Sequence, residues 1–189
     1  MSVYCILYES EKEYIPYEYL WYNKNMYLGI DYGRVRIGLA VSDTGQIARP
    51  IGHIQNKGDK KNLAAIRDVL TKHFKNPAVA HTTSDSGSTK HITPHIVCGL
   101  PLLADGTEGD MAREARRFGE LLRSSLGASV SYHNERYSSF DAEEYIRDKM
   151  GIFNREKIKE LVDGVAASMI LQGYLDDLHN LRGGLCGQK

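Results

Sequence analysis

The sequence has little cysteine, no net charge and no long apolar run, and each of these absences excludes a class of protein. Its 189 residues contain three cysteines, Cys5, Cys98 and Cys186. Their wide separation fits neither a zinc site nor a disulfide framework, which indicates a reducing, cytoplasmic compartment. No stretch approaches the roughly 20 apolar residues that cross a bilayer, so we expect no membrane span. No basic segment followed by an apolar run opens the chain, so we expect no signal peptide.

Positive and negative charges balance: lysine and arginine number 24 together, and so do aspartate and glutamate. The net charge therefore gives no sign of a nucleic-acid partner. Nucleic-acid binding would have to come from a local basic patch. The length of the chain is that of a single domain with a complete hydrophobic core. Its hydrophobic fraction of 42% is close to that of an average soluble globular protein.

Two segments differ in composition from the rest of the chain. Residues 1–25 are rich in tyrosine and glutamate, and the alternatives are an added element, a binding tail, or residues upstream of a start at Met26. Residues 77–94 are polar, and we predict a long exposed loop there. We therefore expect one domain over residues 26–180, interrupted by that loop and followed by a short tail over 181–189.

Hydrophobic periodicity and turn signals predict five strands and four helices. The first three strands follow one another with short connections, so we expect them to be antiparallel. The expected strands cover residues 26–31, 37–42, 47–54, 96–99 and 129–133. The expected helices cover residues 59–74, 110–125, 138–150 and 155–177, the last of them capped by Asn154. This order predicts an α/β fold, with a mixed sheet covered by helices.

Two acidic residues lie at the ends of predicted strands. Asp31 ends the first strand before a sharp turn, and Glu135 follows the strand over 129–133. Functional groups gather at strand ends in open α/β sheets, because the loops there can form a crevice. Each residue also has an ordinary interpretation. Asp31 could cap the turn with its own side chain, and Glu135 could pair with Arg136 in an exposed loop.

Asp163 lies inside a predicted helix that is apolar on nearly every side. An unpaired ionised carboxylate is costly in such a place, so Asp163 requires a cation or hydrogen-bond donors. A structural ion pair with an arginine is the alternative to a functional site. The small side chains of Ala166 and Ala167 beside it would let a sheet approach closely. Carboxylates that converge without histidine or cysteine suit hard cations such as Mg²⁺ or Mn²⁺, which can activate water for phosphodiester cleavage.

These acidic residues lie in motifs that resemble one known family. The segment 29–43, GIDYGRVRIGLAVSD, closely resembles the opening of the YqgF family. The segment 97–106, VCGLPLLADG, is similar to its central Gly-Leu-Pro loop, and 133–139, HNERYSS, to its Asp-Glu-Arg segment. Residues 163–176 resemble its C-terminal helix. The resemblance covers residues 26–177, and members of this family are described both as Holliday-junction resolvases and as pre-16S rRNA nucleases.

The resemblance implies an RNase H-like fold, with a five-stranded mixed sheet flanked by helices. It also implies that Asp31, Glu135 and Asp163 are both catalytic residues and ligands of one or two divalent metals, Mg²⁺ or Mn²⁺. The implied substrate-binding residues are Arg34, Arg36, Arg136 and Ser138, since a guanidinium can grip phosphate oxygens with two hydrogen bonds. The family usually has aspartate where Asn134 stands, and we expect this change to remove a charge beside the metal rather than a metal contact.

The function that the resemblance implies is a metal-dependent nuclease acting on structured RNA, with processing of the 5′ end of pre-16S rRNA as its role. One alternative is a resolvase of branched DNA, which should be a homodimer rather than a monomer. Another is an inactive RNA-binding ribosome-assembly factor with a basic patch formed by Arg34, Arg36, Arg49, Lys57, Lys60 and Lys61. The Asp-x-Gly opening at Asp31 also resembles actin-like ATPases, but those typically need two such domains, and this chain has room for one.

Overall fold

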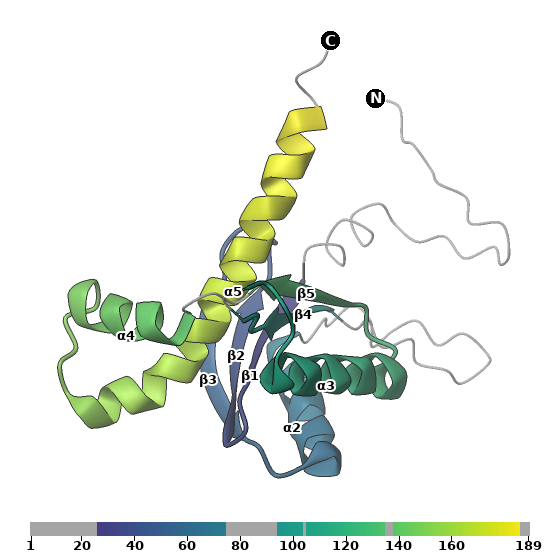
Figure 1. Ribbon diagram of the computed structural model, residues 1–189, viewed down its shortest axis with the longest axis horizontal. Helices are drawn as coiled ribbons and strands as arrows, with labels where there is room; N and C mark the ends of the chain where they lie inside the picture. The colour runs from purple at the N-terminus through teal and green to yellow at the C-terminus, as the bar shows by residue number, and fades with distance from the viewer. Residues whose placement is uncertain (1–25, 75–93, 104, 135–137, 186–189) are drawn as a thin grey trace, which may run out of the picture.

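The structure, a computed structural model, describes residues 26–74, 94–103, 105–134 and 138–185. A single five-stranded sheet crosses its centre, and helices cover both of its faces (Figure 1). The strands are β1 (Tyr27–Tyr32), β2 (Arg36–Ser42), β3 (Arg49–Gln55), β4 (His95–Leu100) and β5 (Val130–Asn134). The helices are α2 (Asp59–His73), α3 (Asp110–Leu126), α4 (Ser138–Asp148) and α5 (Arg155–Leu185).

The strand order across the sheet is β3-β2-β1-β4-β5. β1 pairs antiparallel with β2, and β2 pairs antiparallel with β3. On the other side, β1 runs parallel to β4, and β4 runs parallel to β5. The carboxyl ends of β1, β4 and β5 therefore lie at the same edge of the sheet. The predicted mixed sheet, with three antiparallel strands first, is confirmed.

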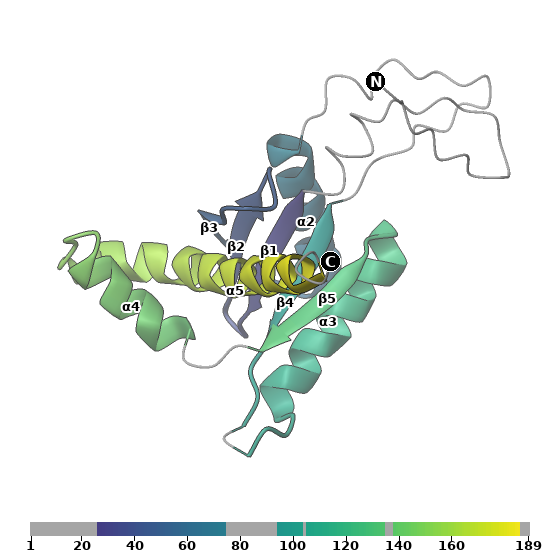
Figure 2. The same cartoon turned by 90° about the horizontal axis from the view of Figure 1, so that it is seen from above.

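Successive side chains of each strand point to opposite faces of the sheet, so the core is divided into two layers. Leu28, Ile30 and Tyr32 of β1 pack against Phe118 of α3 and Ile66 of α2 on one face. The residues between them face the other way, where Tyr27 of β1, Ala40 of β2 and Val97 of β4 form a second core with α5. Figure 2 shows α5 lying across one face of the sheet, with α2 and α3 on the opposite side.

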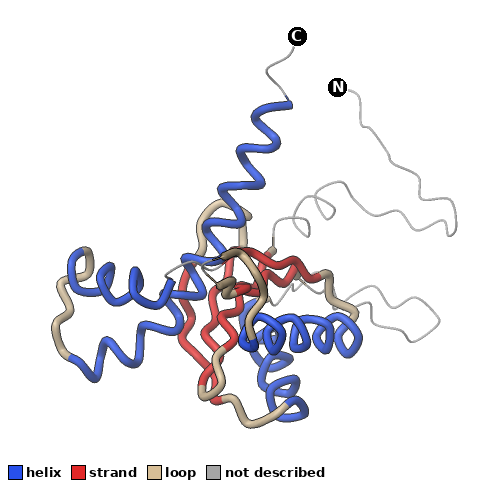
Figure 3. The backbone as a smooth tube through the Cα atoms, in the orientation of Figure 1, coloured by secondary structure: helices blue, strands red, loops and turns tan. Residues whose placement is uncertain are grey.

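The second core continues outward along α5. The first half of α5 packs against α4 through Ile146, Ile158 and Ala166, so these two helices form a hairpin beside the sheet (Figure 3). Because α5 touches the sheet on one side and α4 on another, its apolar residues surround the helix rather than forming one stripe. This explains why the sequence of α5 is apolar on nearly every side.

Most elements begin or end one or two residues away from their predicted boundaries, and α5 differs by more. β3 begins at Arg49 rather than residue 47, and the side chain of Ile47 is exposed. α5 does not end near Asp177 but continues to Leu185, through most of the segment that was expected to be a tail. The extension is consistent with the sequence, because Leu175 and Leu178 contact the second core and no glycine or proline occurs between Gly173 and Gly183.

Three of the other expectations fall wholly or partly outside the described residues: the segment 1–25, the loop over 77–94, and the end of the chain after Leu185. Asn154 caps α5 as predicted, since its side-chain oxygen accepts hydrogen bonds from the backbone N–H groups of Glu156 and Lys157, at 2.9 and 3.2 Å. None of the helices in the described ranges is long and apolar enough to cross a membrane.

Glycines allow α5 to approach the sheet unusually closely. A Cβ atom at Gly38 of β2 would overlap the backbone carbonyl of Asp163. A Cβ atom at Gly164 of α5 would lie 2.9 Å from the backbone nitrogen of Gly52, and one at Gly29 of β1 would lie 2.9 Å from the carbonyl oxygen of Ala167. The close approach that the small residues of α5 predicted is therefore present, and glycines on the strands contribute as much to it as the helix does.

Replacing Gly38 with alanine should destabilise the protein by roughly 1–3 kcal/mol, because the added methyl group meets helix backbone that cannot rotate away. The loss would be measured as a lower midpoint of urea unfolding. Ala64→Ser on the exposed side of α2 is the control, with an expected change within about 0.5 kcal/mol. An unchanged midpoint for Gly38→Ala would show that α5 can move off β2 without cost.

Candidate active site

Asp31 lies near the carboxyl end of β1, at the edge where β4 and β5 also end. It pairs across the sheet with Gly38 of β2. Directly opposite residues on antiparallel strands project from the same face, and the face of Gly38 is the one that α5 covers. The sheet register therefore directs the Asp31 side chain toward the face that carries α5.

Asp163 reaches the same place from the helix. Its backbone packs directly on Gly38, the sheet partner of Asp31. The structure thus brings Asp31 and Asp163, which are 132 positions apart in the sequence (163 − 31), to neighbouring positions on either side of one glycine. Two of the three predicted metal ligands are thus neighbours of the same glycine, and their role as ligands stays a prediction.

The Asp163 side chain is 20% exposed and has two basic neighbours. Its Oδ2 atom lies 2.8 Å from Nε of Arg36 and 3.4 Å from Nδ1 of His53. Neither N–H group is aimed well enough to make a hydrogen bond, so this buried oxygen has electrostatic neighbours but no hydrogen-bond partner. The ion pair with an arginine, which the sequence left open as the alternative for Asp163, is present.

The third predicted carboxylate, Glu135, lies outside the described residues, as does Arg136. The strand that leads to them, β5, ends at Asn134, at the same sheet edge as Asp31. Ser138 begins α4, but its side chain is not described. Among the described residues, no three histidine, cysteine, aspartate or glutamate side chains come together to form a metal-binding group. The three-carboxylate metal site thus stays a prediction.

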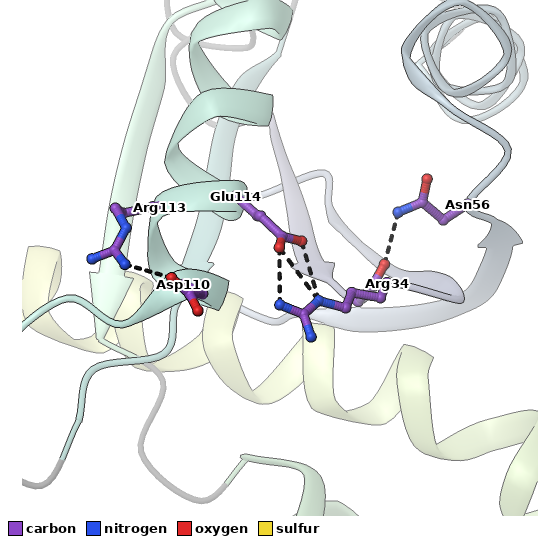
Figure 4. Close-up of polar contacts among 6 residues, drawn as sticks. Arg34, Asn56, Asp110, Arg113 and Glu114 are labelled. Carbon is purple, nitrogen blue, oxygen red and sulfur yellow. Dashed lines mark hydrogen bonds and ion pairs between the residues drawn. The ribbon is translucent and has the colours of Figure 1, made fainter.

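Arg34 occupies the turn between β1 and β2, immediately beyond Asp31. Figure 4 shows its guanidinium turned toward Glu114 of α3, where Nη2 and Nε donate hydrogen bonds to Oε1 over 3.0 and 3.3 Å. This side-chain hydrogen bond, together with the negative charge of Glu114, raises the pKa of Arg34. Its side chain is 61% exposed, so a phosphate could reach the guanidinium but would compete with Glu114 for it.

Two asparagines that the sequence analysis missed fix the position of this turn. The side chain of Asn56 donates a hydrogen bond to the carbonyl of Gly33 over 2.9 Å, which Figure 4 also shows. Asn62, 1% exposed, donates to Asn56 over 2.9 Å and accepts from the backbone N–H of Lys57 over 3.0 Å. A sequence signal was available, because Asn62 lies one turn before buried Ile66 on the apolar face of α2.

The basic patch predicted for the assembly-factor alternative consists of two groups of residues. Arg34, Arg36 and Arg49 each have an acidic partner, with Arg49 2.7 Å from Asp43. The remaining members are exposed lysines at the start of α2 and in the loop before it: Lys57, Lys60 and Lys61. The asparagine pair connects the backbone of Lys57, in the loop before α2, to the turn that carries Arg34.

A five-stranded mixed sheet of this order, with helices on both faces, is the arrangement of an RNase H-like fold. The chain belongs to the RuvX family, described as Holliday junction resolvase, whose model matches residues 25–177. The expected YqgF membership is thereby confirmed.

Curated relatives resemble the chain over most of their length. A protein of Anaeromyxobacter dehalogenans (strain 2CP-C) is 41% identical over 150 residues, which cover 79% of this chain and 95% of the relative. A protein of Myxococcus xanthus (strain DK1622) is 35% identical over 79% of this chain and 86% of its own. Both carry the name "Putative pre-16S rRNA nuclease".

Solved structures resemble the chain only distantly. T. thermophilus RuvC in complex with Holliday junction substrate matches 82% of this chain and 96% of that chain, with 12% identity and a TM-score of 0.48. A likeness at this level carries no argument about substrate or mechanism, so the assignment to the family rests on the sequence matches.

Removing the buried amide in Asn62→Ala should cost about 1–3 kcal/mol of stability, because the partners of a buried hydrogen bond are left unsatisfied. It should also speed hydrogen exchange at the amide of Lys57, which loses its acceptor. Thermal unfolding and amide exchange measure the two effects. Asn180→Ala on the exposed side of α5 is the matched control. Slow exchange at Lys57 in the Asn62 variant would disprove the role given to this asparagine.

Proposed function

We propose that the chain is a metal-dependent endonuclease of structured RNA that processes the 5′ end of pre-16S rRNA in the cytoplasm. The observation that carries the proposal is the convergence of Asp31 and Asp163 on Gly38, at the carboxyl ends of the parallel strands. The names of the relatives in Anaeromyxobacter and Myxococcus support RNA as the substrate.

The residues at this site suit a hard divalent cation. Asp31 and Asp163 offer carboxylate oxygens, which Mg²⁺ and Mn²⁺ prefer, and the buried Oδ2 of Asp163 lacks a hydrogen bond that would occupy it. We assign Glu135 as the third ligand. When bound, such a cation lowers the pKa of water and stabilises charge on phosphate oxygens.

Hydrolysis requires water to add to phosphorus while the bond from phosphorus to the leaving oxygen breaks. In this proposal Asp31 and Asp163, which both neighbour Gly38, would hold the cation. Arg34, 61% exposed at the end of the neighbouring turn, contacts a phosphate of the substrate as it exchanges Glu114 for the new anion. Arg136 and Ser138 remain the other predicted substrate contacts. Asn134 in place of the usual aspartate lowers the negative charge beside the cation without removing one of these ligands.

The second candidate function is resolution of four-way DNA junctions, which the description of the family model favours. This function would use the same carboxylates and metal but a different substrate. A resolvase cuts two strands symmetrically, so it requires a homodimer, whereas rRNA processing is possible for a monomer. Substrate choice and oligomeric state therefore separate the two.

Asp31→Asn and Asp163→Asn should each lower the rate of cleavage at least about 100-fold, because an amide binds a divalent cation far more weakly than a carboxylate. The assay offers a labelled precursor rRNA fragment and a four-way DNA junction, each with Mg²⁺, Mn²⁺ or EDTA. Asp68→Asn on exposed α2 is the control and should leave the rate unchanged.

Cutting of the RNA alone supports the rRNA function, and symmetric cutting of the junction alone supports the resolvase. No cutting of either substrate by folded wild-type protein, together with RNA binding that survives EDTA, would overturn the nuclease and favour the assembly factor.

The lysine group supplies charge for the nucleic-acid backbone. Replacing Lys57, Lys60 and Lys61 together with glutamine should weaken binding and reduce the slope of log affinity against log salt by about 2 to 3, since each phosphate contact contributes close to one. Binding is measured in EDTA at several salt concentrations. Glutamine at Lys149, Lys157 and Lys159, exposed on the α4–α5 hairpin, is the matched control. Equal slopes in the two triple variants would exclude a special role for the first group.

A further inference from the structure

Arg36 forms a bridge between the sheet and α5 on the face that holds the carboxylates. It is the first residue of β2, two positions before Gly38, so its side chain projects toward α5. Its Nη1 donates a hydrogen bond to the backbone carbonyl of Lys159 over 2.9 Å, and its Nε lies 2.8 Å from Oδ2 of Asp163. The same guanidinium thus touches α5 one turn apart, at residues 159 and 163.

The charges at this place require compensation. Asp31 and Asp163 are carboxylates on either side of Gly38, and like charges in a partly buried setting disfavour one another. Arg36, with its side chain 30% exposed, is the cation next to Asp163. His53 is the other basic neighbour, at 3.4 Å. In the absence of metal, the guanidinium of Arg36 provides the positive charge that a divalent ion would otherwise bring.

The contact between Arg36 and Asp163 is suited to exchange. No guanidinium N–H group points at Oδ2 closely enough for a hydrogen bond, so the pair is held by charge and proximity. The directed hydrogen bond of Arg36 goes instead to the carbonyl of Lys159. Arg36 can therefore release the carboxylate while it stays attached to α5. The position of α5 does not depend on the pair, because the second core and the glycine contacts hold the helix to the sheet.

We propose that Arg36 is an internal counter-cation that competes with the divalent metal for Asp163 and thereby sets the metal concentration at which the site fills. The inference rests on the proposed function, in which Asp31 and Asp163 bind that metal. It changes the role of Arg36 from the predicted substrate contact to that of a positioning residue. Without metal, a site of this kind has part of its negative charge offset, and it fills only when the metal is abundant enough to displace the guanidinium.

The test is the affinity of the full chain for Mn²⁺, measured by calorimetry and by the electron paramagnetic resonance signal of free Mn²⁺. Arg36→Gln should bind Mn²⁺ about tenfold more tightly than wild type, because one opposing charge has been removed. Arg36→Lys keeps the charge and should stay within about twofold of wild type. Arg49→Gln is the matched control: it removes an arginine of the neighbouring strand whose partner is Asp43, and should leave affinity unchanged.

A stability measurement provides a second readout that a structural role alone would not produce. Without metal, Arg36→Gln should unfold at a lower temperature than wild type, and saturating Mn²⁺ should raise its unfolding temperature by more than it raises that of wild type. Circular dichroism shows whether the variant is folded. If the glutamine variant does not fold, Arg36→Met keeps the aliphatic stem and makes the same test.

The outcomes separate this inference from the function on which it rests. If wild type binds Mn²⁺ and the folded Arg36→Gln variant binds it equally or more weakly, the counter-cation is disproved and the metal site stands. If neither wild type nor Arg36→Gln binds Mn²⁺ in the millimolar range, the metal site itself fails. Loss of binding in Asp163→Asn, with tighter binding in Arg36→Gln, supports both.

Discussion

The contact between α5 and β2 at Gly38 is the constraint on which the rest of the site depends. Only a residue without a Cβ atom lets the helix backbone at Asp163 rest on the strand. That contact places Asp163 next to Asp31, which the sheet register holds opposite Gly38. A helix one side chain farther from the sheet would separate the two carboxylates. In the proposed function, the close packing therefore serves the metal site as well as the core.

Charge balance is the second feature that organises this region. Two arginines in the described part of this region have acidic partners: Arg34 has Glu114, and Arg36 has Asp163. Each pair offsets one negative charge, and in the proposed function both pairs rearrange when a cation and a phosphate bind. The exposed Lys57, Lys60 and Lys61 are the charges that the proposed function assigns to the nucleic-acid backbone.

Much of the fold could be predicted from the sequence because its strands are apolar and its turns are marked by glycine and aspartate. Asp163 was identified because a carboxylate inside an apolar helix needs a partner, but the sequence could not choose between a metal and an arginine. That choice depends on which strand residue faces α5, hence on the register that puts Arg36 two positions from Gly38. Asn56 and Asn62 were missed because their roles arise from contacts between the turn after β1, the loop after β3 and the first turn of α2. The length of α5 was underestimated: the helix continues past Leu178, which packs on the second core, through Leu181, whose side chain is exposed.

The most direct test of the central claim is a crystal structure of the protein grown with Mn²⁺, with data collected to show anomalous scattering from manganese. The account predicts a peak bonded to carboxylate oxygens of both Asp31 and Asp163, at about 2.0–2.3 Å, with the guanidinium of Arg36 moved away from Asp163. A crystal soaked in millimolar Mn²⁺ that shows no peak there, with Arg36 still paired to Asp163, would contradict it.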